Sequence, residues 1–131
     1  MKIHHIGYAV KNIDKSLSIF ERLGFHKITG IVRDSIRKVD IVFIADENNM
    51  NTVELIAPYE KGSDVDGPLN MWGGPAPYHV CYEVDNIEEC INEFGKSCLV
   101  IKKPEIAPAI DNRRVAFLYH KDLGLFEVVE R

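Results

Sequence analysis

The sequence predicts an α+β fold made of two β-α-β-β-β modules that arose by internal duplication. A shift of 74 positions (79 minus 5) aligns residues 3–13 with residues 77–87, and five residue types recur identically. The matched pairs are His5/His79, Tyr8/Tyr82, Val10/Val84, Asn12/Asn86 and Ile13/Ile87. The same shift aligns residues 41–44 with 115–118, and a shift of 73 (127 minus 54) aligns residues 53–56 with 126–129. Since one insertion or deletion separates the copies, we expect two modules related by a pseudo-twofold axis.

The first module begins with a strand over residues 3–10, which are rich in β-branched and aromatic types and bounded by polar residues. Alternation along this strand puts His5 on the face opposite Tyr8. A helix is expected to begin at Asn12 or its neighbour and to end at Gly24, which can adopt a left-handed conformation. Its inward stripe is expected to be Leu17, Phe20 and Leu23. Three strands complete the module, at residues 25–32, 39–44 and 52–57.

The second module is expected to repeat this order after a linker rich in glycine and proline. We assign residues 1–58 to module one, 59–75 to the linker and 76–131 to module two, as parts of one domain. The linker has room for one helical turn at 69–72. In module two, a helix at 87–94 is expected to be capped by Asp85 and Glu88. The remaining elements are strands at 78–84, 98–102, 115–119 and 125–130 and a loop at 104–112.

Composition narrows the classes of function. The chain has 131 residues and a net charge of −4, without a basic stripe, so we expect no nucleic-acid partner. No apolar run approaches the roughly 20 residues of a membrane helix, and the N-terminus has no apolar leader. The three cysteines are odd in number and form no CxxC pair, which favours reduced thiols in a cytoplasmic protein.

The duplication points to a metal site. His5 with His79 and Glu54 with Glu127 are the polar residues of ligand type that recur at matched strand positions. A carboxylate buried without a partner within an apolar strand is expensive, by several kcal/mol. If the modules pack about a pseudo-twofold axis, the four side chains converge on one divalent cation, whose charge the two carboxylates neutralise.

Each of these residues taken alone has a plainer explanation. A single strand histidine is more often exposed or a satisfied core group, and a single strand glutamate more often faces solvent. The set of four favours the metal because independent surface residues have no reason to obey one repeat. His4, His26 and His120 have no histidine at their repeat positions, and we interpret them as structural or exposed.

Two further features leave alternatives open. Asp40, whose repeat position holds Arg114, either lines a cavity or lies on the surface. The loop 104–112 is either a lid or anion-binding edge, or a plain surface connection.

These motifs resemble the vicinal oxygen chelate superfamily, also called the glyoxalase/bleomycin resistance fold. The residues that carry the resemblance are His5 in HIGYAV, Glu54 in VELIAP, His79 in YHVCYEVDNI and Glu127 in GLFEVVE. The resemblance covers essentially the whole chain and implies a half-open barrel around a metal held by these four residues. Within the superfamily the chain is most similar to the methylmalonyl-CoA epimerases, through ELIAP, EVDNI and VAFLYHKDLG.

The resemblance implies a metal-dependent isomerase or epimerase that abstracts a proton next to a carbonyl. Glu127 is then the first choice for the base, and Glu54 would act on the opposite side of the substrate. The metal can be Co, Ni, Zn, Mn or Mg, the substrate is a small carbonyl compound or thioester, and a homodimer is implied. The loop at 104–112 departs from the usual epimerase loop, which leaves the acyl-CoA substrate open.

Three other activities occur on this fold. A glyoxalase I-like lactoylglutathione lyase uses the same ligands, but its usual Asn-Trp-Gly is replaced here by residues 57–59. A metal-free antibiotic-binding protein would not need four ligand-type side chains. An iron(II) dioxygenase is disfavoured because that chemistry prefers two histidines with one carboxylate.

Overall fold

The computed structural model describes residues 1–131, which fold as two compact units. The first unit spans His5–Tyr78, and the second combines His79–Arg131 with Met1–His4. The first half of the chain forms β1 (Lys2–Ala9), α1 (Ile13–Arg22), β2 (His26–Lys27), β3 (Val32–Asp34), β4 (Val39–Ala45), β5 (Thr52–Pro58) and α2 (Asp66–Trp72). The second half forms β6 (Ala76–Val84), α3 (Ile87–Phe94), β7 (Leu99–Ala107), the 3₁₀ turn η1 (Pro108–Ile110), β8 (Arg113–His120) and β9 (Gly124–Glu130). No helix has the length and apolar character needed to cross a membrane.

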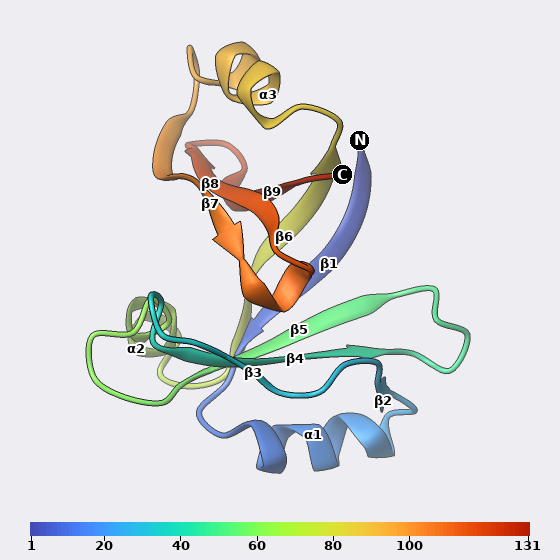
Figure 1. The fold of residues 1–131 in the computed structure, drawn as a ribbon. Helices are drawn as coiled ribbons and strands as arrows, with labels where there is room; N and C mark the ends of the chain where they lie inside the picture. The colour runs from blue at the N-terminus through green and yellow to red at the C-terminus, as the bar shows by residue number, and fades with distance from the viewer. The chain divides into compact units, whose positions relative to one another are not determined.

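The strands of the first unit form a mixed arrangement in the order β2-β4-β5-β1, with β3 also paired to β4. β1 and β5 are parallel, whereas β4 is antiparallel to β2, β3 and β5. Figure 1 shows α1 along one side of β4 and β5. Its buried residues Ile13 and Leu17 pack with apolar side chains from the helix-facing side of these strands.

The second unit repeats the arrangement in the order β6-β9-β8-β7. β6 and β9 are parallel, and the other two pairs are antiparallel. α3 packs against β8 and β9 through Ile87 and Cys90 (Figure 1). Each unit therefore has a helix-facing side of its strands, which holds a core, and an opposite side, which is free of the helix.

The helices α1 and α3 begin in the same way, each with an asparagine as its N-cap. Asn12 caps α1 by accepting a hydrogen bond from the backbone N–H of Lys15 at 2.9 Å, and Asn86 caps α3 by accepting one from Glu89 at 3.0 Å. The prediction that Asp85 and Glu88 cap α3 is wrong. Their carboxylates instead accept hydrogen bonds from arginines, Asp85 from Arg131 at 2.6 Å and Glu88 from Arg114.

Two predictions for the first unit are corrected. Leu23 is 69% exposed rather than inward-facing, because α1 ends at Arg22 and Leu23 is already the C-cap residue. The strand expected at 25–32 is divided into β2 and β3. The hydroxyl of Thr29 accepts a hydrogen bond from the backbone N–H of Phe43 at 3.0 Å, so a side chain replaces a backbone carbonyl of the ladder there.

The second unit also departs from prediction at one strand. β7 continues through Pro104 to Ala107, where a loop was expected, and its pairing with β8 shifts register twice. Proline is tolerated because β7 is the last strand of its series and its N–H groups on one side need no ladder partner. In the linker, α2 runs over Asp66–Trp72 and is longer than the single turn expected.

Candidate metal centre

The first predicted ligand pair is formed by β1 and β5. These parallel strands align Gly7 with Glu54, so Glu54 and His5 lie on the same side of the strands, away from α1. His5 is 1% exposed and Glu54 is 4% exposed. The imidazole Nε2 of His5 lies 3.8 Å from a carboxylate oxygen of Glu54. The first unit thus brings these two residues together, both buried.

The second unit forms the matching pair from β6 and β9. Cys81 aligns with Glu127, as Gly7 aligns with Glu54 in the first unit. His79 and Glu127 are each 4% exposed, and Nε2 of His79 lies 3.1 Å from a carboxylate oxygen of Glu127. The equivalent residues of the repeat thus form equivalent buried His–Glu pairs.

Each pair is flanked by a phenylalanine that the sequence reasoning did not assign to the site. Phe43 of β4 lies opposite Glu54, and Phe117 of β8 lies opposite Glu127. The ring of Phe43 meets His5 at 5.2 Å between centroids, and the ring of Phe117 meets His79 at the same separation. The signal was present in the sequence, since the two phenylalanines are 74 positions apart (117 minus 43).

The chemistry of the two pairs suits a divalent metal ion. Imidazole nitrogen and carboxylate oxygen are the ligands that Zn²⁺ and related divalent ions accept in mixed sets. Each unit provides one of each, and each carboxylate is buried, where its charge requires a partner. The donor types therefore fit a divalent cation.

The other histidines are placed outside these pairs. His4 is half-buried, and its Nε2 lies 3.5 Å from a guanidinium nitrogen of Arg113. His26 is exposed on β2. Nδ1 of His120 accepts a hydrogen bond from the backbone N–H of Asp122 at 3.0 Å, in the turn before β9. These contacts agree with the structural or exposed roles expected from the sequence.

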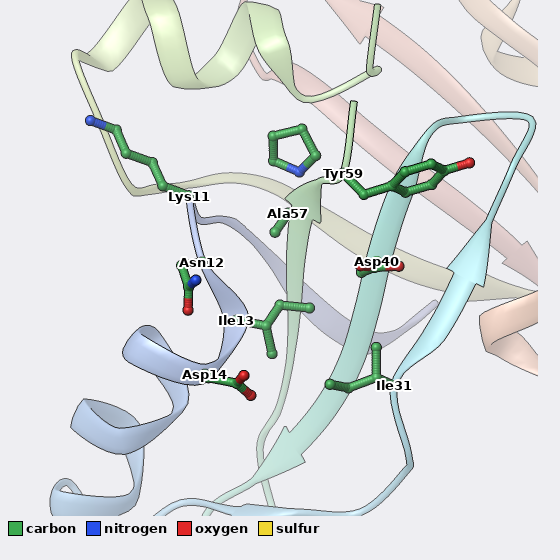
Figure 2. A pocket seen from close by; sticks show the side chains of 9 residues that line it. Lys11, Asn12, Ile13, Asp14, Ile31, Asp40, Ala57 and Tyr59 are labelled. Atoms are coloured by element: carbon green, nitrogen blue, oxygen red, sulfur yellow. The ribbon is translucent and has the colours of Figure 1, made fainter. Parts of the chain in front are cut away.

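Asp40 lies on β4 beside a cavity of about 230 Å³ that none of the four predicted ligands lines. Its carboxylate accepts two hydrogen bonds from Arg33, at 2.8 and 3.0 Å, and this contact lowers the pKa of Asp40. The Arg33 guanidinium also lies 4.0 Å from the centre of the Tyr59 ring. Figure 2 shows Lys11 on one side of this cavity and Asp40 and Tyr59 on the other.

The matched region of the second unit is an ion-pair network around Arg114. Its guanidinium donates to both carboxylate oxygens of Glu88 and also to Glu130. These contacts lower the pKa of both glutamates. The neighbouring Arg113 donates to Glu83 at 2.8 Å and to the carbonyl of Glu130 at 2.6 Å.

Comparison with known proteins gives several relatives. Mitochondrial methylmalonyl-CoA epimerase from Homo sapiens is 26% identical over 124 residues, which cover 94% of this chain and 69% of the relative. The ethylmalonyl-CoA/methylmalonyl-CoA epimerase of Cereibacter sphaeroides is 24% identical over 126 residues, which cover 94% of this chain and 91% of the relative. These findings confirm the resemblance to methylmalonyl-CoA epimerases.

Solved structures and a family model agree with these relatives. A hypothetical protein from Bacillus halodurans superposes with a TM-score of 0.85 at 26% identity, over 99% of this chain and 94% of that one. The methylmalonyl-CoA epimerase of Mycobacterium tuberculosis shares the fold, with a TM-score of 0.82 at 19% identity, over 98% of this chain and 87% of that one. The predicted α+β fold is thereby confirmed. Residues 4–117 match the glyoxalase/bleomycin resistance protein/dioxygenase superfamily, and the chain belongs to this superfamily.

Proposed function

We propose that this protein is a metal-dependent epimerase that inverts a carbon next to the carbonyl of an acyl-CoA thioester of the methylmalonyl type. The observation that carries the proposal is the pair of equivalent, buried His–Glu contacts, His5 with Glu54 and His79 with Glu127. The names of the relatives, which are methylmalonyl-CoA epimerases, support the choice of substrate class.

The metal ligands of the proposal are His5, Glu54, His79 and Glu127. Two carboxylates would neutralise a divalent charge, and two neutral imidazoles would complete four protein ligands. The ion when bound polarises the substrate carbonyl and makes the adjacent C–H group more acidic. The metal is Co, Ni, Zn, Mn or Mg, all of which accept nitrogen and oxygen ligands.

The two glutamates also provide the acid and base of the proposal. Inversion at one carbon requires proton transfer on both faces of a planar intermediate, and the repeat supplies a carboxylate from each module. In this step Glu127 would start as the carboxylate and remove the proton, while Glu54 would start protonated and deliver its proton to the opposite face, so that the two protonation states exchange. Both side chains are buried, at 4% exposure each.

The decisive experiment combines metal analysis with two activity assays. Purified protein is analysed for bound metal, then assayed for epimerisation of methylmalonyl-CoA and for conversion of methylglyoxal with glutathione. We expect about one divalent ion per chain, epimerase activity that chelation removes and metal restores, and no glutathione-dependent activity. A metal-bound protein active only in the second assay would identify a glyoxalase I-like lyase. A protein that binds none of these metals would overturn the proposal and favour a small-molecule binding role.

We further propose a homodimer in the cytoplasm. The location is supported by the three buried free cysteines, Cys81, Cys90 and Cys98, which suit a reducing compartment. The dimer rests on family resemblance. Sedimentation of the metal-loaded protein measures it directly, and a mass of one chain at micromolar concentration would contradict it.

A further inference from the structure

Two phenylalanines make the same contact with the two histidines of the proposed site. The rings of Phe43 and His5 are 5.2 Å apart with an angle of 81° between their planes. The rings of Phe117 and His79 are 5.2 Å apart at 87°. Edge-to-face packing at centroid distances of about 4.5–7 Å is a preferred geometry for aromatic rings. The arrangement therefore recurs, nearly unchanged, in both units.

Each phenylalanine also lies beside the glutamate of its pair. The β4–β5 register places Phe43 opposite Glu54, and the β8–β9 register places Phe117 opposite Glu127. Residues directly opposed in antiparallel strands have Cβ atoms about 4.5–5.5 Å apart. One ring thus adjoins both members of each His–Glu pair.

Packing of the helix-facing cores does not explain this recurrence. Neither Phe43 nor Phe117 belongs to the apolar clusters under α1 and α3, which are built from the other side of the strands. Phe117 is only half-buried, so it is not held as a core residue. Matched positions on these two strands can differ, as Asp40 and Arg114 do, whereas phenylalanine occupies both position 43 and position 117.

The orientation of an imidazole ring decides whether it can bind a metal. The lone pair of the ring nitrogen lies in the ring plane, so rotation about the Cβ–Cγ bond turns it away from the ion. A perpendicular neighbour resists that rotation, because the turning edge of the imidazole would collide with the phenyl ring. Residues that fix the orientation of metal-binding histidines by hydrogen bonding lower metal affinity about 10–100-fold when they are lost. A ring that fixes the orientation by packing is expected to act in the same direction.

We propose that Phe43 and Phe117 are positioning residues, which hold the rings of His5 and His79 in the orientation that directs a nitrogen toward the metal. This inference rests on the proposed function and identifies a pair of residues beyond the four ligands. The two phenylalanines act through the histidines and not by contact with substrate.

The test compares leucine variants at these positions with leucine variants of core phenylalanines. F43L and F117L remove the ring at the site. F20L and F126L remove a ring from the helix-facing cores, where Phe20 packs against Tyr8 and Phe126 against Tyr82. Zn²⁺ or Co²⁺ affinity is measured on metal-free full-length protein by competition with a chelator. We expect a loss of about 10–100-fold for F43L and F117L and unchanged affinity for the two core variants.

A second measurement does not depend on metal binding. The imidazole ¹H and ¹⁵N resonances of His5 and His79 are followed in the metal-free protein. Wild type is expected to show one sharp set for each ring, and the leucine variant is expected to broaden the set of its own histidine only. F43Y and F117Y retain a ring, so they are expected to have the metal affinity and the sharp resonances of wild type. If a leucine variant fails to fold, F43M and F117M, which fill similar space without a ring, replace it in both measurements.

Two results would overturn the positioning role. One is wild-type metal affinity in F43L and F117L, and the other is an equal loss of affinity in F20L and F126L. Failure of the proposed function looks different, because wild-type protein would then bind no metal. In that event the resonances still decide whether the phenylalanines fix the rings.

Discussion

The two units share the same site residues on the side of their strands away from the helix, but differ at matched positions near the helix N-terminus. Away from the helices, the same three residue types recur in both units: a histidine, a glutamate and a phenylalanine. At the helix N-terminus on the other side, Glu88, Arg114 and Glu130 form an ion-pair network in the second unit. The matched residues of the first unit, Asp14, Asp40 and Ala57, line a cavity instead.

This difference distinguishes the positions of the proposed metal site from positions that only support the fold. These matched positions can differ because the Asn caps and the core under the helix are present in both units. The His–Glu–Phe positions have not diverged. The proposed metal site would place the same chemical requirement on both units, which accounts for the recurrence of these three residue types.

The largest expected effects concern Glu127 and Glu54 and distinguish their roles in proton transfer. E127Q is expected to slow exchange of the substrate α-hydrogen in deuterated water by at least about 100-fold, the contribution typical of a general base. E54Q is expected to retain exchange, since proton removal and return remain possible on one face, but to lose net inversion. Exchange is followed by mass spectrometry and inversion by a coupled assay, with bound metal measured in each variant.

Two outcomes would change the assignment of the base. Normal exchange in metal-bound E127Q would remove Glu127 from this role. Equal loss of exchange in both variants would mean that the His5–Glu54 and His79–Glu127 pairs are functionally equivalent, despite separations of 3.8 and 3.1 Å.

The next effect distinguishes the adjacent histidines of β1. H5A removes a proposed ligand and is expected to weaken metal binding by more than the roughly 100-fold that loss of a supporting residue produces. H4A is the matched control, because His4 is half-buried near Arg113 and its repeat position holds Tyr78. Calorimetric titration of metal-free protein gives both affinities. If H4A loses as much affinity as H5A, the repeat has identified the wrong histidine.

A smaller effect tests whether the helix starts are equivalent. N12A and N86A each remove one capping hydrogen bond, of 2.9 and 3.0 Å. Each is expected to lower the free energy of unfolding by about 1 kcal/mol. Urea denaturation of the two variants, with N12D and N86D as cap-retaining controls, measures this. A cost confined to one variant would show that the helices depend on their caps to different degrees.

The smallest effect concerns the ion pairs and depends on pH. Arg114 is half-buried, so solvent partly screens its contacts, but it binds two carboxylates, whereas Arg33 binds one, that of Asp40, and lies over the Tyr59 ring. R114M is therefore expected to lower the unfolding temperature more than R33M at pH 7. The folded-state pKa values of Glu88 and Glu130 are lowered by Arg114, so this stabilisation is present above their ordinary pKa of 4.5.

The same stabilisation is lost as the pH falls through those lowered values. Wild type and R114M are expected to converge in acid, as followed by thermal unfolding across pH 3 to 7, and also at high salt, where screening weakens the pairs. A difference that persisted in acid would assign the effect of Arg114 to packing of its aliphatic stem.

The sequence predicts those features that depend on residue period and on the repeat. The helices at Ile13–Arg22 and Ile87–Phe94 were expected from their apolar spacing, with Asn12 as the start of the first, whereas the Asn86 cap of the second was not predicted. The His–Glu pairs follow from matched positions of the repeat. Phe43 and Phe117 obey the repeat, but an apolar residue in an apolar strand does not by itself indicate a site. Only the strand register and the ring contacts show that each lies beside a glutamate and a histidine.

Other features are invisible without tertiary contacts. Thr29 divides a predicted strand because its hydroxyl meets the N–H of Phe43, which is 14 residues away in the chain. Asp85 and Glu88 have the right spacing to cap α3, but arginines from distant strands bind both carboxylates. Pro104 lies inside a strand because that strand is at the end of its series. The first two departures reflect partners that lie far away in the sequence, and the third reflects the position of β7 at the end of the strand order.

The form of β7 bears on the aggregation of this protein. A long end strand with exposed Leu99 and Ile101 could recruit strands from other molecules and start polymerisation. Pro104 removes an N–H group from that strand, and the two register shifts bend it away from a flat template. Both features disfavour pairing of β7 with strands of other molecules. P104V is therefore expected to increase thioflavin-positive aggregates during refolding without changing metal affinity.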